Sequence, residues 1–159
     1  MPNYRVRIMG AIAAPLFALS GLCAAEDGVS SDTIVIGQSA PLTGPAAMIG
    51  NAARAGALAY FEHVNRSGGV NGRKIVLETV DDGFQAEKAA ENTRTLIEKT
   101  KVFALFGYVG GPASMAAFPI ATTAKVPFIG AFNGNEMLRA PFNKYVFNVR
   151  ASFPTRWVS

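Results

Sequence analysis

The chain has 159 residues, of which 50% are apolar and 16% charged, and 15 Lys and Arg residues against 11 Asp and Glu residues give a formal net charge of +4. This composition is typical of a globular protein and excludes a disordered or collagen-like chain, and the length suggests one domain. Without residues 1–25, 13 basic residues remain against 11 acidic ones, an excess too small to indicate a nucleic-acid-binding surface. Cys23 is the one cysteine, so no internal disulfide can form.

Residues 1–25 have the layout of a secretory signal peptide. Arg5 and Arg7 supply the positive start, and 16 uncharged, mostly apolar residues follow from Ile8 to Cys23. Small residues just before Glu26 then predict cleavage between residues 25 and 26. An uncleaved anchor helix is the alternative, but the apolar stretch is shorter than the ~20 residues that a membrane span needs. We therefore expect an exported protein whose mature chain begins at Glu26.

Strands and helices alternate along the rest of the chain. Apolar patterning and turn residues predict strands over residues 33–37, 74–80, 102–107, 126–129 and 145–149, and helices over residues 47–65, 85–99 and from Pro112 onward. We expect Pro119 to kink or shorten the third helix. An alternation of this kind indicates right-handed βαβ units, and so an α/β fold with a doubly wound, mostly parallel sheet.

The first predicted helix has an apolar face that we expect to pack on the sheet, formed by Ile49, Ala53, Gly56, Tyr60 and Val64. Asn65 is expected on the opposite side. His63, the one histidine, is expected to be half-buried at the edge of the apolar face. A single histidine away from the carboxyl ends of the strands, with no cysteine retained after cleavage, indicates neither a nucleophilic catalytic site nor a usual zinc site.

Two loops contain residue types that could take part in chemistry. Asp81 and Asp82 end the second predicted strand, and adjacent strand residues point to opposite faces, so we expect them to shape the turn rather than flank one substrate. The glycine-rich loop 107–111 matches neither a P-loop nor a dinucleotide-binding fingerprint. Its backbone N–H groups at a helix start could hold a carboxylate, with Tyr108 as an aromatic wall. The alternative is a tight connection with no ligand.

Three segments together carry a family resemblance: Ser39–Ala47 (SAPLTGPAA), Gly68–Ile75 (GGVNGRKI) followed by Asp81-Asp82, and Phe106–Pro112 (FGYVGGP) with Val126–Gly130 (VPFIG) downstream. In this order they resemble the periplasmic substrate-binding proteins of branched-chain amino acid ABC transporters, the Leu/Ile/Val type. The resemblance covers residues 33–150. It implies a periplasmic binding protein type I fold, in which ligand binds between two α/β lobes. Residues 26–150 would form part of the first lobe, and residues 151–159 the start of the hinge.

The resemblance also implies where ligand binds. The loop after the third strand would hold the ligand carboxylate, and the loop after the fourth strand would contact the rest of the ligand, with an apolar wall near Met48. The residues that fall at these positions are Ile49, Tyr108, Gly110, Gly111, Ser114, Phe132, Asn133 and Gly134. Gly111 and Gly134 replace hydroxyl residues of the family pattern. An aromatic acid or another carboxylate therefore fits as well as leucine.

By resemblance, the protein is an exported, periplasmic solute-binding component of an ABC importer, with a small carboxylate as ligand and an inner-membrane permease as partner. No enzymatic activity, cofactor, metal or nucleic acid is implied. A ligand-sensing domain of the same fold, such as an amide-type regulator or a receptor ectodomain, is the alternative. A nucleotide-dependent enzyme would need a phosphate-binding fingerprint after Gly37, which the sequence lacks. Alone, residues 26–159 are expected to leave apolar surface uncovered and to associate.

Overall fold

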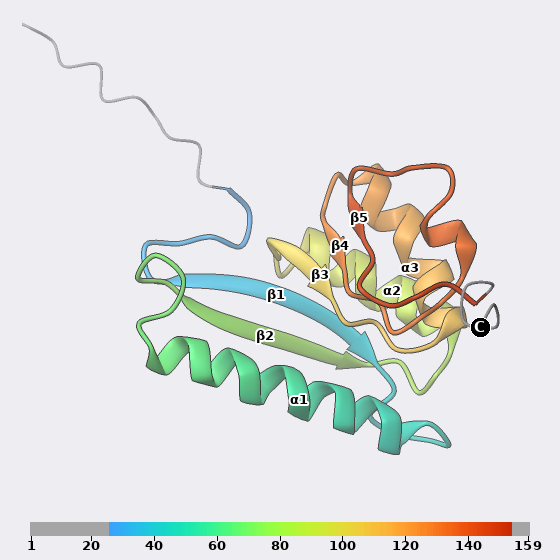
Figure 1. Ribbon diagram of the computed structural model, residues 1–159, viewed down its shortest axis with the longest axis horizontal. Coiled ribbons are helices and arrows are strands. Elements are labelled where there is room, and N and C mark those ends of the chain that lie inside the picture. Colours follow the sequence, from blue (N-terminus) through green and yellow to red (C-terminus); the bar gives the residue numbers. More distant parts are fainter. Residues whose placement is uncertain (1–25, 154–159) are drawn as a thin grey trace, which may run out of the picture.

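The computed structural model describes residues 26–153, so the predicted signal peptide and residues 154–159 lie outside the described residues. One sheet contains the strands β1 (Thr33–Ala40), β2 (Lys74–Asp81), β3 (Ala104–Phe106), β4 (Phe128–Ile129) and β5 (Val146–Phe147). Their order is β2-β1-β3-β4-β5, and all neighbouring strands are parallel (Figure 1). The predicted doubly wound α/β fold is therefore confirmed.

Helices connect the strands on both faces of the sheet. They are α1 (Ala47–Arg66), α2 (Ala86–Glu98) and α3 (Gly111–Thr123), and a short 3-10 helix, η1 (Glu136–Leu138), lies in the segment predicted as a loop. The helix α1 runs beside β1 and β2, while α2 and α3 lie together on the other side (Figure 1). Pro119 does not shorten α3, because the helix continues to Thr123.

The main core lies between the sheet and the pair α2 and α3. Leu105 and Phe128 from the sheet pack there with Leu96 of α2 and Ala117 of α3, and all four are buried. Gly37 of β1 fits the same layer, since a Cβ atom there would lie 3.1–3.2 Å from the side chains of three core residues. Burying these apolar side chains holds α2 and α3 against the strands.

The face of α1 that packs on the sheet is not the one predicted from the sequence. Tyr60 is 66% exposed, and His63, expected to be half-buried, is exposed. Gly50 is buried instead. The backbone of α1 packs closely at this residue, since a Cβ atom there would lie 1.9 Å from the carbonyl oxygen of Pro41. Asn65 faces the sheet: its amide donates to the backbone oxygen of Ile75 at 2.8 Å and accepts from the nitrogen at 2.7 Å. A polar side chain of α1 thus satisfies both backbone groups of Ile75 in the edge strand β2.

Apolar surface stays open on the α1 side of β3, β4 and β5. Phe106 packs against Phe61 of α1, with ring centroids 5.4 Å apart, beside a hollow of about 390 Å³. Beyond it, Phe147 and Val149 are 51% and 81% exposed. The described residues therefore include the uncovered apolar surface that the sequence predicts.

Candidate functional site

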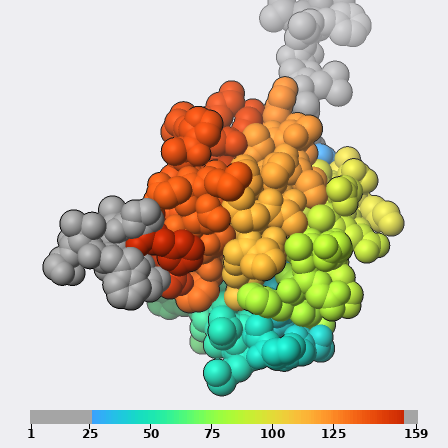
Figure 2. Space-filling view, turned by 90° about the vertical axis from the view of Figure 1, so that its right-hand side faces the viewer, coloured from blue at the N-terminus to red at the C-terminus, as the bar shows by residue number. Residues whose placement is uncertain are grey.

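All the strands end at one edge of the sheet, and the loops that follow them meet there. In parallel α/β sheets this carboxyl edge is where ligands bind. Figure 2 views the molecule from this side, with the start of α1 in cyan at the bottom and the residues near 150 in red. A pocket of about 220 Å³ lies at this edge. Its lining residues are Ile49, Phe84, Val109, Gly110, Gly111, Phe132, Asn133, Gly134, Arg150 and Phe153.

The start of α3 forms one side of the pocket. The first N–H groups of a helix have no partner within it, and Pro112 has no N–H, so the N–H group of Gly111 is the donor that the helix start presents in the pocket lining. Gly110 precedes the helix with a φ of 92°, in the region that favours glycine. Nothing lies within 4 Å of where a Cβ atom of Gly111 would be. This helix end is therefore open to a ligand and favours an anion.

The loop after β2 delivers an aromatic ring to the same place. Asp82 is buried and accepts from the hydroxyl of Ser39 and from the backbone nitrogen of Phe84, both at 2.8 Å. Phe84 takes a φ of 66°, and its ring would lie 2.4 Å from a Cβ atom on Gly110. Glycine at 110 is thus required by both the backbone angle and the ring. Burial raises the pKa of Asp82 above its ordinary value.

The neighbouring carboxylate, Asp81, holds the loop between β1 and α1. It accepts from the hydroxyl of Thr43 and from the backbone nitrogens of Leu42 and Gly83, the latter two at 2.8 and 2.9 Å. The Thr43 hydroxyl, more than the backbone donors, lowers its pKa to about 2. Asp81 and Asp82 therefore point to different partners, as the sequence predicts, and both act as turn residues.

The loop after β4 supplies Phe132 and Asn133. The backbone nitrogen of Phe132 donates to the oxygen of Tyr108 at 2.8 Å, which ties the two loops together. Asn133 is only 4% exposed, and its Oδ1 accepts from the nitrogen of Asn135 at 3.0 Å. Its Nδ2 is buried and has no hydrogen-bond partner among residues 26–153. One residue of the pocket lining thus has a buried donor that no described protein group satisfies.

Among residues 26–153, Arg150 supplies the one charged side chain in the pocket lining. Its guanidinium carbon lies 4.1 Å from the ring centroid of Phe132, a cation–π contact. The side chain of Arg139 donates to the backbone oxygen of Arg150 and, at 2.8 Å, to that of Asn135. Arg139 thereby fastens the segment after β5 to the loop after β4. Within the described part of the chain, the lining has a positive charge and no carboxylate.

Six of the eight residues predicted for the site line this pocket: Ile49, Gly110, Gly111, Phe132, Asn133 and Gly134. Tyr108 and Ser114 do not. The ring of Tyr108 lies in the core against Phe128, and its hydroxyl is 2.8 Å from that of Thr93. Burial raises the pKa of this phenol. Ser114 is buried and donates to the oxygen of Gly110 at 2.7 Å. Tyr108 is therefore not the aromatic wall that the sequence predicted.

The sequence prediction missed the side chains of Phe84 and Arg150. A detectable signal existed for each, because both follow the carboxyl end of a strand that the sequence predicts. Met48, expected near the apolar wall, lines a neighbouring hollow of about 300 Å³ with Ile49 and Phe132. The apolar wall therefore extends from the pocket onto the start of α1.

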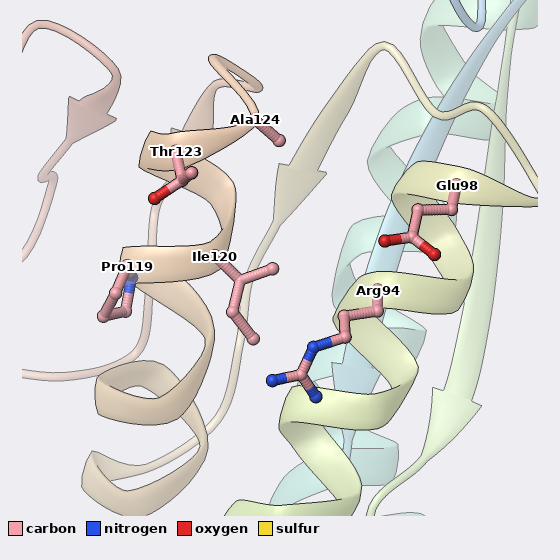
Figure 3. A pocket seen from close by; sticks show the side chains of 6 residues that line it. All are labelled: Arg94, Glu98, Pro119, Ile120, Thr123 and Ala124. Carbon is pink, nitrogen blue, oxygen red and sulfur yellow. The ribbon is translucent and has the colours of Figure 1, made fainter.

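A second groove lies on the opposite side of the fold. Figure 3 shows Arg94 and Glu98 projecting from α2 toward α3, where Ile120 and Ala124 lie. These residues are near the carboxyl ends of their helices, and so at the edge of the sheet away from the ligand pocket. Within residues 26–153, no cluster of His, Cys, Asp and Glu side chains could hold a metal ion, and no helix is long and apolar enough to span a bilayer.

Comparison with known proteins identifies the class. The sequence matches the periplasmic binding protein family over residues 33–157, so the chain belongs to this family. The resemblance to proteins of the Leu/Ile/Val-binding type is likewise confirmed.

Three similar proteins show how closely this chain matches members of the family. The Leu/Ile/Val-binding protein homolog 7 of Brucella suis is 34% identical over 115 residues, which is 71% of this chain and 28% of that protein. A possible leucine/isoleucine/valine-binding protein from Rhodopirellula baltica superposes with a TM-score of 0.72 at 35% identity, covering 82% of this chain and 34% of that one. A fatty acid ABC transporter substrate-binding protein from Thermomonospora curvata gives 0.69 at 26% identity, covering 80% and 31%. The chain thus spans about a third of these proteins or less.

Proposed function

We propose that the protein is the exported solute-binding component of an ABC importer and that it delivers a small carboxylate, such as an amino acid or an aromatic acid, to an inner-membrane permease. Residues 26–150 would contribute part of the first lobe of the binding cleft. The observation that carries the proposal is the open start of α3 in the lining of the pocket. The N–H group of Gly111 has no partner within the helix, and Arg150 adds a positive charge to the same lining.

The size and polarity of the pocket support a small ligand. A volume of about 220 Å³ is below the range of ~300–1,000 Å³ for drug-sized ligands. Most of its lining side chains are apolar, and its polar side chains are those of Asn133 and Arg150. Such a pocket orients a molecule with a single acidic group and an apolar body. The names of the similar proteins, which refer to leucine, isoleucine, valine and fatty acids, fit this description.

Titration calorimetry on the full-length gene product tests the ligand class. Leucine, phenylalanine and benzoate are compared with leucinamide, phenylalaninamide and benzamide, which lack the acid. At least one acid should bind with a micromolar dissociation constant, and its amide should bind about tenfold more weakly or worse, because a charge-assisted hydrogen bond is lost. Equal binding of acid and amide, or no binding of any acid, contradicts the proposal.

Uptake of the identified ligand tests the importer role. Deleting the gene should reduce uptake of the labelled ligand, and supplying the gene again should restore it. Normal uptake by the deletion strain, with binding intact, would contradict the importer role and favour a ligand-sensing domain of the same fold.

A further inference from the structure

We propose that Phe84 contacts the ligand and that the carboxylate of Asp82, together with the hydroxyl of Ser39, is the positioning group that holds the Phe84 ring in the pocket lining. This inference rests on the proposed function and deepens it, because it assigns a specificity-determining contact to the loop after β2. None of these three side chains belongs to the site predicted from the sequence.

The first support is the backbone of Phe84, which takes a φ of 66°. This left-handed angle is unfavourable for a bulky side chain, and proteins keep such angles mainly where surrounding groups enforce them, often at functional sites. Within residues 26–153, the other non-glycine residues with positive φ are Asn71, Lys101 and Lys125, and none of them lines the pocket. The strained non-glycine residue in the pocket lining is therefore an aromatic one.

The second support is the place where this angle puts the ring. A Cβ atom on Gly110 would lie 2.4 Å from Cε2 of Phe84, so the ring packs directly on the residue before α3. Gly111, the first residue of α3, lines the same pocket. Phe84 nevertheless stays 42% exposed among the described residues. A ligand whose carboxylate meets the N–H group of Gly111 therefore lies beside the ring, and its apolar body can cover the exposed part.

The third support is a series of hydrogen bonds that holds Phe84 at this angle. The buried carboxylate of Asp82 accepts from the backbone nitrogen of Phe84 and, through its other oxygen, from the hydroxyl of Ser39, both at 2.8 Å. The amide of Asn92 on α2 donates to the Ser39 hydroxyl and to the backbone oxygen of Asp81, both at 3.1 Å. Asp82 itself is not in the pocket lining, so it acts on a ligand through Phe84.

Titration calorimetry on the full-length gene product with leucine, phenylalanine and benzoate tests the contact. Phe84→Gly should weaken the acid that the wild type binds about tenfold or more, because the apolar contact is lost. Its midpoint of urea unfolding should stay close to that of the wild type, since glycine adopts the positive φ without strain. Phe142→Gly is the matched control: it removes an exposed ring outside the pocket lining and should bind like the wild type.

Two variants of Asp82 test the positioning role. Asp82→Asn keeps an oxygen that can accept from the Phe84 nitrogen, and its amide can donate to Ser39, so the affinity should stay within about threefold of the wild type. Asp82→Ala removes both bonds and should weaken the same acid about tenfold or more. In the Phe84→Gly background, Asp82→Ala should change the affinity by about twofold or less, because the ring through which it acts is already absent.

The outcomes separate this inference from the proposed function. If the wild type and Phe84→Gly bind an acid equally, Phe84 is not a ligand contact, and the proposed function stands. Equal losses from Asp82→Ala with and without the ring overturn the positioning role. If Asp82→Ala fails to fold by far-ultraviolet circular dichroism, Ser39→Ala replaces it and should weaken binding about threefold with the ring present and not without it. If the wild type binds none of the acids, the proposed function fails and this inference with it.

Discussion

A carboxylate oxygen of Asp81 lies 2.8 Å from the backbone nitrogen of Leu42, so the end of β2 holds the loop that leads from β1 into α1. The same oxygen accepts from the nitrogen of Gly83 at 2.9 Å, and the second oxygen accepts from the hydroxyl of Thr43. One side chain thus fixes two of the loops at the ligand edge of the sheet.

Replacing Asp81 by alanine should lower the free energy of unfolding by about 1 kcal/mol or more, because several donors lose their acceptor at once. Urea unfolding of the purified protein measures this. Glu78→Ala is the matched control, since Glu78 is an exposed carboxylate on the same strand. A loss no larger than that of the control would contradict the role given to Asp81.

The contribution of Asp81 to stability should depend on pH. Its pKa is about 2 in the folded protein against an ordinary value of 3.8, so the ionised form is favoured by folding. That stability is fully present above the ordinary value and is lost as the pH falls from 3.8 toward 2. The difference in unfolding free energy between the wild type and Asp81→Asn should therefore shrink over this range, and a constant difference would contradict the assignment.

Asp82 should act in the opposite direction. Its raised pKa means that folding favours the protonated form. This contribution is present below the ordinary value of 3.8 and is lost as the pH rises through the raised value. Comparing Asp82→Asn with Asp81→Asn over the same acid range separates the two groups, because the two variants should change the pH profile with opposite signs. Profiles shifted in the same direction would show that one carboxylate is misassigned.

Tyr108→Phe should affect stability and not ligand binding. Thr93 donates to the oxygen of Ala89 at 2.6 Å, so the phenol of Tyr108 donates to Thr93, and its removal leaves no buried donor without a partner. The expected loss is about 1 kcal/mol by thermal or urea unfolding. The dissociation constant of the ligand should stay within twofold of the wild-type value. A tenfold increase in a folded variant would show that Tyr108 contributes to ligand binding.

The uncovered face of the sheet should drive association of residues 26–159 when they are produced alone. Phe147 and Val149 are 51% and 81% exposed there. Exposed apolar patches and sheet edges favour self-association, so size-exclusion chromatography should show oligomers. Replacing both residues by lysine should shift the protein toward a monomer, while the same change at the exposed Thr123 and Ala124 should not. A monodisperse wild-type monomer would contradict this prediction.

Sequence patterning predicted the order of the elements because βαβ units depend on local apolar periodicity. The register of α1 was not predictable in this way, because Asn65 is polar and yet faces β2 through two hydrogen bonds to Ile75. Tyr108 was misplaced for a related reason. The side chain of a residue just after a strand can point into the core or out of it. The hydrogen-bond partner of Tyr108 in the core is Thr93, which lies on α2 and is not adjacent to Tyr108 in the sequence.

The sequence analysis found the glycine positions of the site and Phe132, but it missed Phe84 and Arg150. Gly110 and Gly111 stand out in the sequence between a buried strand and a proline. Phe84 reaches Gly110 from a loop after β2 that takes positive φ angles, and Arg150 lies over the ring of Phe132. Both contacts join segments far apart in the sequence.

The central claim is that a carboxylate binds at the start of α3, and Gly111→Asp tests it most directly. A Cβ atom at 111 meets nothing within 4 Å, and an acid in the first turn of a helix is favourable, so the variant should fold at least as stably as the wild type. Calorimetric titration of the full-length protein with 3-phenylpropanoate, leucine and benzoate should show wild-type binding of at least one acid. We predict that Gly111→Asp abolishes that binding by placing its own carboxylate there, while the neutral Gly111→Asn retains most of it. Unchanged affinity in a folded Gly111→Asp protein would contradict the claim.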